Sequence, residues 1–222
     1  MISSRLSESM EMYLKSLVEL SSDKPVALSL LAEHLGVTPV SANEMIHKLS
    51  KRGLAIHQPY KGATLTEDGR AIAVDILRRQ RLWERFLYDH LKIEWAKIYD
   101  FSCSLEHATE PEVVEALADF LDHPTTCPRG NPIPSADGKF SRLRAPSLSE
   151  MSVGTKVRIL AVNAVYLEVL AYFEKHDILP GKELTIADVA PMQGPLTVKV
   201  GNKEVAVGVE AAKFVLVEVV SN

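Results

Sequence analysis

Apolar residues in the N-terminal part of the chain recur at the three- and four-residue spacing of amphipathic helices. The first such run covers residues 12–20 and ends where polar residues and Pro25 stop a helix. A second helix is expected over residues 28–35, and a third over residues 39–52, where proline suits the first turn. The pattern predicts two helices joined by a tight turn.

A short hairpin is expected after the third helix. Residues 54–57 are typical of a strand, residues 58–62 of a turn and residues 63–65 of a returning strand. The N-terminal region is therefore predicted to be a winged helix-turn-helix. Thr66 then caps a long helix that continues to about Leu91 and is apolar on more than one face, as in a helix that joins a dimer interface.

The second half of the chain changes from helical to strand-like patterns. Helices are expected over residues 95–107 and 111–121, before a proline-rich stretch at residues 127–134. The later apolar runs are short and separated by Gly, Pro and Asn, which predicts a small, partly open β barrel. These runs cover residues 156–162, 183–189, 196–200, 204–209 and 214–219.

The fold class is therefore α+β with several domains. We divide the chain into a winged helix-turn-helix at residues 1–72, a helical domain at 73–134, a linker at 135–149 and a β domain at 150–222.

Composition narrows the class of protein. The chain has 222 residues, of which 46% are hydrophobic, so it can bury a sizeable core. No apolar run is long enough for a membrane helix and the start lacks a signal-like core, so a cytoplasmic protein without a membrane partner is expected. Cys103 and Cys127 lie far apart, which argues against a disulfide scaffold or a structural zinc site.

The third helix carries candidate DNA-binding residues. The net charge of −4 requires any DNA-binding surface to be a local basic cluster. Hydroxyl, amide and cationic side chains are mixed on this helix and at the wing, as needed to contact both bases and phosphates. The alternative is a solvated helix face in a winged helix that binds protein. The candidates are Thr38, Pro39, Ser41, Asn43, Lys48, Lys51 and Arg52, with Lys61 at the wing.

A candidate metal site lies in the helix predicted at residues 95–107. Cys103, Glu106 and His107 stand three and four residues apart, which places a thiol, a carboxylate and an imidazole on one helical face. These ligand types suit a first-row transition metal, and an incomplete set of three needs further donors from elsewhere. The alternative is an ordinary helix with a buried Cys and a surface Glu-His pair.

Several motifs together resemble the diphtheria toxin repressor and iron-dependent regulator family, over nearly the whole chain and in the same order. The resemblance implies a winged helix, a helical dimerisation and metal-binding domain, and a C-terminal SH3-like domain. It also implies a repressor of iron or manganese homeostasis that binds an inverted repeat of double-stranded operator DNA as a homodimer, with one or two dimers per operator. The motifs are Glu11-Met12-Tyr13-Leu14, Leu65-Thr66-Glu67-Asp68-Gly69-Arg70, Arg81-Leu82-x-Glu84, Cys103-x-x-Glu106-His107 and Gly130-Asn131-Pro132-Ile133-Pro134.

The same resemblance implies a primary metal site of Met12, Cys103, Glu106 and His107. Manganese regulators of the family usually carry carboxylates at the first two positions. Because thioether and thiol are softer donors, Fe²⁺ is favoured over Mn²⁺, while Co²⁺, Ni²⁺ or Zn²⁺ can compete in vitro.

A second metal site departs from the family pattern. Gln80 and Tyr99 stand where two histidine ligands are expected. A weakened site would use Glu84, Cys127 and Glu168, with His123 as a stand-in for the histidine that Arg129 replaces. The alternative is that Cys127 packs in a loop and that Glu84 pairs with Arg81 or Arg85.

Apolar side chains of the long helix and of residues 111–121 are expected at the dimer interface, with core packing as the alternative. No catalytic residue is expected, because no oxyanion grouping or phosphate loop is visible. Two other hypotheses stay open: a redox sensor that acts through Cys103 or Cys127, and a metal-independent regulator. The expected interface residues are Trp83, Phe86, Leu87, Val114, Leu117 and Phe120.

Overall fold

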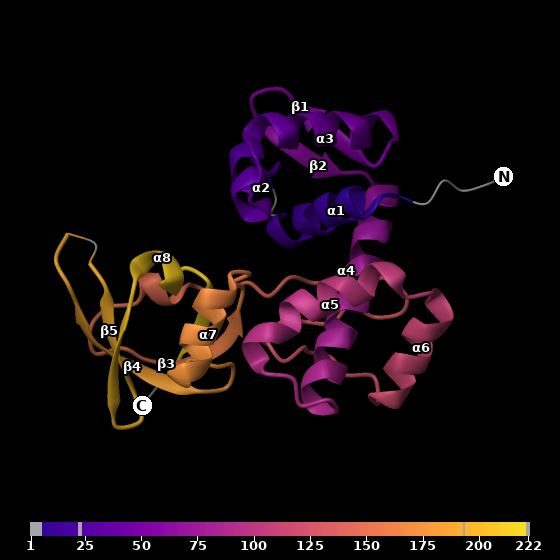
Figure 1. Cartoon of the computed structure of the whole chain (residues 1–222). Coiled ribbons are helices and arrows are strands. Elements are labelled where there is room, and N and C mark those ends of the chain that lie inside the picture. Colours follow the sequence, from indigo (N-terminus) through magenta and orange to yellow (C-terminus); the bar gives the residue numbers. More distant parts are fainter. Residues whose placement is uncertain (1–5, 22–23, 193, 221–222) are drawn as a thin grey trace. The chain divides into compact units, whose positions relative to one another are not determined.

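The computed structural model describes residues 6–21, 24–192 and 194–220. The chain forms two compact units, whose elements are labelled in Figure 1. The first unit comprises residues 1–80, 105–114 and 134–140, and the second comprises residues 81–104, 115–133 and 141–222.

The first unit contains the expected winged helix-turn-helix. Helix α1 (Glu8–Leu20) is followed by α2 (Leu28–Leu35) and α3 (Pro39–Lys51). The hairpin consists of β1 (Ala55–Gln58) and β2 (Gly62–Leu65), which pair antiparallel. The predicted helices and wing are confirmed, with boundaries that differ by a few residues.

Local chemistry explains where these helices begin and end. The Thr38 side chain accepts a hydrogen bond from the Ser41 amide at 3.1 Å and caps α3, whose first residue is Pro39. Gly36 ends α2 with a left-handed φ of 65°, a conformation that favours glycine. The turn between α2 and α3 is therefore fixed by residues that are recognisable in the sequence.

The core of this unit lies between the three helices and the wing. Leu14, Leu17, Ile46, Leu49 and Leu77 are fully or almost fully buried there. Burial of a side chain of this size contributes about 1.5–3 kcal/mol, so the apolar faces of α1 and α3 hold the domain together.

Four helical segments follow the wing: α4 (Glu67–Asp89), the 3₁₀ turn η1 (Trp95–Lys97), α5 (Ile98–Ala108) and α6 (Pro111–Phe120). Thr66 accepts a hydrogen bond from the Gly69 amide at 3.0 Å, which confirms it as the cap of α4. A Cβ atom at Gly69 would lie 1.9 Å from the Leu54 carbonyl oxygen, so this close approach of α4 to the wing requires glycine.

The C-terminal region is a five-stranded antiparallel sheet in the order β6-β5-β4-β3-β7. All five predicted strand regions are found. Two helices inside this region were not expected, α7 (Leu167–Lys175) and α8 (Val209–Ala212), and a 3₁₀ turn, η2 (Leu148–Glu150), precedes it. The strands are β3 (Lys156–Val162), β4 (Glu183–Val189), β5 (Leu196–Val200), β6 (Lys203–Val207) and β7 (Val215–Val219).

Among the described residues, no helix combines the length and the apolar character that crossing a membrane requires. The longest, α4, has 23 residues but carries charged side chains along its length.

Candidate metal centre and nucleic-acid interface

The candidate DNA-binding side chains lie on α3, at its ends and at the wing. All of them are exposed except Asn43, which is half-buried. The cations Lys48, Lys51 and Arg52 gather at the C-terminal end of α3, and Lys61 lies in the turn between β1 and β2. This arrangement offers a basic, solvent-facing edge in a chain that is acidic as a whole.

Exposed apolar side chains on the same surface were missed by sequence reasoning. Val40 in the first turn of α3 is 67% exposed, and Tyr60 projects from the hairpin turn with a left-handed φ of 62°. Apolar contacts can read thymine methyl groups, so Val40 joins the candidates. The signal available in the sequence was its place directly after Pro39 at the start of the helix.

A pair of histidines connects the third helix to the wing. The rings of His47 on α3 and His57 on β1 pack edge to face with their centroids 4.6 Å apart. This contact packs the wing against the helix beside it.

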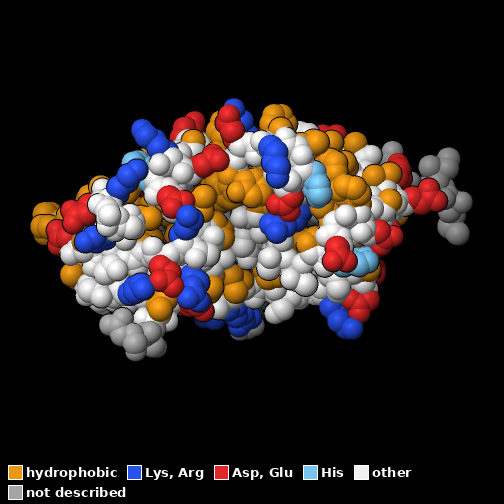
Figure 2. Space-filling view, turned by 90° about the horizontal axis from the view of Figure 1, so that it is seen from below, with side chains coloured by type: hydrophobic (Ala, Val, Ile, Leu, Met, Phe, Trp, Pro, Cys, Tyr) orange, Lys and Arg blue, Asp and Glu red, His pale blue; other side chains and the backbone are white. Residues whose placement is uncertain are grey.

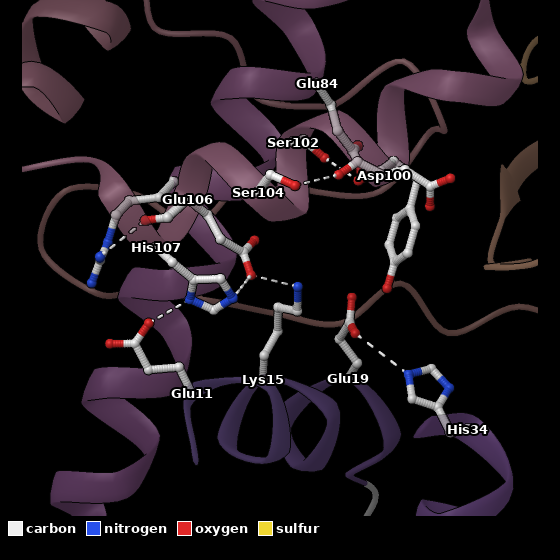
Figure 3. Close-up of polar contacts among 12 residues, drawn as sticks. Glu11, Lys15, Glu19, His34, Glu84, Asp100, Ser102, Ser104, Glu106 and His107 are labelled. Atoms are coloured by element: carbon white, nitrogen blue, oxygen red, sulfur yellow. Dashed lines mark hydrogen bonds and ion pairs between the residues drawn. The ribbon is translucent and has the colours of Figure 1, made fainter. Parts of the chain in front are cut away.

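Two of the four primary metal-ligand candidates face helix α1 across a short gap (Figure 3). Glu106 on α5 is fully buried, and its Oε1 atom lies 2.6 Å from the Nζ atom of Lys15 on α1, whose side chain is 1% exposed. The ammonium group of Lys15 is therefore a counter-ion for the Glu106 carboxylate inside the protein. Sequence reasoning missed Lys15 altogether.

His107 makes a second polar connection to α1. Its Nδ1 atom lies 2.6 Å from Oε2 of Glu11. An ionised carboxylate only accepts hydrogen bonds, so we assign the proton to Nδ1, which donates it to Glu11. In the neutral imidazole, Nε2 then carries the lone pair that a metal needs, and carboxylate partners of this kind commonly orient histidine ligands.

The facing donors suit a cation. Nε2 of His107 lies 3.5 Å from Oε1 of Glu106, so a lone pair and a carboxylate oxygen point toward the same small space. A positive charge relieves the repulsion between them, and here Lys15 supplies it. The donor types at this point therefore fit a divalent ion.

The remaining candidates do not complete a metal site in the described residues. No group of three or more His, Cys, Asp or Glu side chains there is close enough to hold an ion. Met12 on α1 and Cys103 on α5 are both half-buried. Cys103 stands one helical turn before Glu106 and His107 on α5, as its spacing predicts.

The second group of ligand candidates does not come together as a metal site among the described residues, although Cys127 lies beside Glu84. Glu84 is fully buried. Its Oε1 atom accepts hydrogen bonds from Arg129, at 2.9 Å from a terminal nitrogen and at 3.1 Å from Nε. His123 is exposed and pairs with Asp119 at 3.3 Å, and Glu168 is exposed at the start of α7. The cation beside Glu84 is thus a guanidinium, from a residue other than the expected Arg81 or Arg85.

Arg129 also connects several segments within the second unit. Its other terminal nitrogen donates to the Ala164 carbonyl at 3.0 Å, and the guanidinium lies 4.5 Å from the centre of the Tyr99 ring. A cation that is 3% exposed and contacts α4, α5 and the loop after β3 fixes these elements together.

Cys127 packs beside this pair. The pKa of its thiol is raised from 9.0 to about 12, mainly by burial and then by the negative charge of Glu84, against the opposing effects of Arg129 and Arg81. Because the thiolate is the reactive form, Cys127 is protected at neutral pH.

We expect only Cys103 to react with a thiol reagent at pH 8 in the native protein. Iodoacetamide labelling followed by mass spectrometry should modify the half-buried Cys103 first and Cys127 only after unfolding. Denatured protein is the control, since both thiols should then react equally. Rapid native labelling of Cys127 would contradict this assignment and reopen the redox-sensor hypothesis for that residue.

An aromatic patch formed by Trp83, Phe86, His90 and Phe120 lies at the end of α4 and on α6. Phe120 is 61% exposed, and its ring centroid lies 5.7 Å from that of Phe86 and 4.9 Å from that of His90. Exposed hydrophobic side chains also lie among acidic and basic ones on the face in Figure 2.

The other three expected interface residues are buried within the chain itself. Leu87, Val114 and Leu117 are 3–8% exposed, so they fit the alternative role in core packing. The aromatic patch is the part of the expected interface that stays accessible to a partner.

Three family models together match most of the chain. The N-terminal DNA binding domain of iron dependent repressors matches residues 5–63, their metal binding and dimerisation domain matches residues 66–135, and the FeoA domain matches residues 147–219. The expected fold class is confirmed.

Curated relatives share these domains. The diphtheria toxin repressor of Corynebacterium efficiens is 31% identical over 168 residues, which cover 72% of this chain and 73% of that protein. The iron-dependent repressor IdeR of Mycobacterium tuberculosis is 26% identical over 226 residues, covering 96% of this chain and 98% of that protein.

Solved structures show the same architecture. A manganese-dependent transcriptional repressor in complex with manganese superposes with a TM-score of 0.83 at 30% identity, covering 95% of this chain and all of that one. The manganese regulator SloR gives 0.80 at 28% identity, covering 95% and 98%. ScaR with bound Cd²⁺ gives 0.80 at 27% identity, covering 94% and 98%.

Proposed function

The chain belongs to the family of the diphtheria toxin repressor and the iron-dependent repressors. We propose that it is a metal-dependent DNA-binding repressor whose regulatory ion is held by Glu106 and His107 with Met12 and Cys103. The observation that carries this assignment is the direct connection between α1 and α5. Helix α1 belongs to the DNA-binding domain, and two of its side chains contact Glu106 and His107.

This connection explains how an ion could control DNA binding. A bound divalent ion supplies strong, directional bonds to donors on both helices. A ligand shifts a conformational equilibrium only through its different affinity for the two states, and donors on two elements provide that difference. Glu106 and His107 would bind the ion from α5, and Met12 would bind it from α1. Glu11 accepts the proton of His107 Nδ1 in a hydrogen bond, which leaves Nε2 as the metal-binding nitrogen.

Double-stranded operator DNA is the proposed target of α3 and the wing. In a homodimer, the two copies of α3 would face successive major grooves of an inverted repeat. Lys48, Lys51, Arg52 and Lys61 would contact phosphates, while Ser41, Asn43 and Val40 would face base edges. The aromatic patch, centred on Phe120, is the proposed dimer surface.

We propose Fe²⁺ as the physiological ion, with Mn²⁺ as the alternative. Thioether and thiol donors favour the softer ion, which points to iron. Two of the solved relatives are described as a manganese-dependent repressor and a manganese regulator, and a third, ScaR, holds Cd²⁺. The donor set, rather than the overall likeness, is therefore the basis for the choice.

The test is DNA binding in anaerobic buffer to the region upstream of the protein's own gene. Wild type should bind with added Fe²⁺ or Mn²⁺ and fail to bind with a chelator, while His107→Ala should bind weakly in every condition because a ligand is missing. The more effective ion identifies the signal. His176→Ala, directly after α7 in the C-terminal domain, is the matched control and should behave as wild type.

Two results would count against the proposal. Equal binding with metal and with chelator would indicate a metal-independent regulator. A metal response that survives in His107→Ala would place the ion elsewhere.

A further inference from the structure

Lys15 is an unusual residue in the core of the winged-helix unit. Lysine is almost never fully buried unless it is paired, and this one is buried among the apolar side chains of α1. Its partner, Glu106, is a side chain from 91 residues further along the chain. Glu106 is also the carboxylate that the proposed function assigns to the regulatory metal.

The Lys15 ammonium and a metal ion would compete for the same charge. Glu106 carries a single negative charge, and its Oε1 atom already lies 2.6 Å from Nζ of Lys15 and 3.5 Å from Nε2 of His107. A divalent ion bound to Glu106 and His107 would therefore stand close to the Lys15 ammonium. Repulsion between two cations at such distances is strong where water is excluded.

We propose that Lys15 is a built-in competitor of the regulatory metal: its ammonium group neutralises Glu106 in the metal-free protein and has to leave that carboxylate when the ion binds. This inference rests on the proposed function. Metal loading is then an exchange of cations on Glu106 rather than an addition to an empty site. Lys15 sets the metal concentration at which the switch responds.

The exchange also connects the ion to the DNA-binding domain. Lys15 and Glu11 are four residues apart on one face of α1, and both contact the ligands on α5. Displacement of Lys15 changes the packing of α1, because its neighbours Leu14 and Leu17 lie in the same core cluster as Ile46 and Leu49 of α3. An event at Glu106 therefore acts on the helix that supports the DNA-reading surface.

Metal affinity of full-length variants tests the proposal without DNA. We expect Lys15→Met and Lys15→Gln to bind Mn²⁺ and Co²⁺ about tenfold more tightly or better than wild type, by titration calorimetry, because the competing charge is gone. Lys15→Arg retains the charge and should keep an affinity near that of wild type. The double variant Lys15→Gln with Glu106→Gln removes the shared carboxylate and should lose the gain.

Thermal unfolding provides a second readout. The metal-free Lys15→Met protein should melt at a lower temperature than wild type, and Mn²⁺ should raise its melting temperature by more than it raises that of wild type. Lys15→Gln can donate a hydrogen bond to Glu106 and serves if Lys15→Met fails to fold.

The outcomes separate the two proposals. Unchanged or weaker metal affinity in both neutral variants would overturn the competition, even if wild type binds metal and loses it in His107→Ala. Wild-type protein that binds no metal, or that responds equally with and without His107, would instead overturn the proposed function.

Discussion

Replacing Arg129 with methionine is expected to lower the free energy of unfolding by about 3–5 kcal/mol, the range for breaking a buried ion pair from one side. The methionine side chain fills much of the same volume, so the loss comes from charge rather than from a cavity. Glu84 would remain fully buried without the guanidinium that faces its Oε1 atom. The Ala164 carbonyl would lose its hydrogen bond from Arg129 as well.

Chemical denaturation followed by circular dichroism measures this loss. Arg158→Met is the matched control, because Arg158 also contacts two carboxylates, Glu183 and Glu218, but on the protein surface. Solvent and salt screen such pairs, so the control should unfold almost as wild type does. If Arg129→Met were equally harmless, the buried pair would not hold the unit together.

A double replacement identifies the source of the loss. Arg129→Met combined with Glu84→Met removes both charges, and buried pairs replaced by apolar residues often cost little. We expect the double variant to be more stable than Arg129→Met alone, which is a coupling that additive effects cannot produce.

The backbone of this protein was more predictable than its buried charges. The helix-turn-helix follows from local signals, namely the cap at Thr38, the proline at the start of α3 and the left-handed glycine after α2. Helix α7 was missed because it lies in an apolar stretch between strands, although Leu170 and Phe173 show helical spacing and are buried.

The partners of these buried charges could not be predicted from the sequence. Lys15 and Glu106 are 91 residues apart and Arg129 and Glu84 are 45 apart, so no local spacing indicates either pair. One clue was present in α1, where a lysine stands among residues that recur as an apolar face. A charge at such a position needs a partner, but the spacing along the chain does not say which carboxylate supplies it.

Replacing Phe120 with aspartate is expected to convert the protein from a dimer to a monomer, with the dimer dissociation constant raised about 100-fold or more. Large aromatic anchors near the centre of an interface carry most of its energy, and Phe120 is the most exposed of the Trp and Phe rings in the aromatic patch. An aspartate there would bring two carboxylates together across a twofold axis, because the same patch of both copies meets in such a dimer. Analytical ultracentrifugation measures the change.

Val153→Asp is the control for this experiment. Val153 is 57% exposed before β3, so it matches Phe120 in exposure but lies outside the aromatic patch. The control should remain dimeric, and so should Phe120→Tyr, which retains the ring. A Phe120→Asp protein that stays dimeric would place the interface elsewhere on the chain.

If the Phe120→Asp protein dissociates, its DNA affinity should fall while its metal affinity stays close to that of wild type, because Glu106 and His107 find their α1 partners within one protomer. The metal site and the dimer surface are then separable parts of one switch, with the ion setting the state of α1 and the aromatic patch setting the spacing of the two DNA-reading helices.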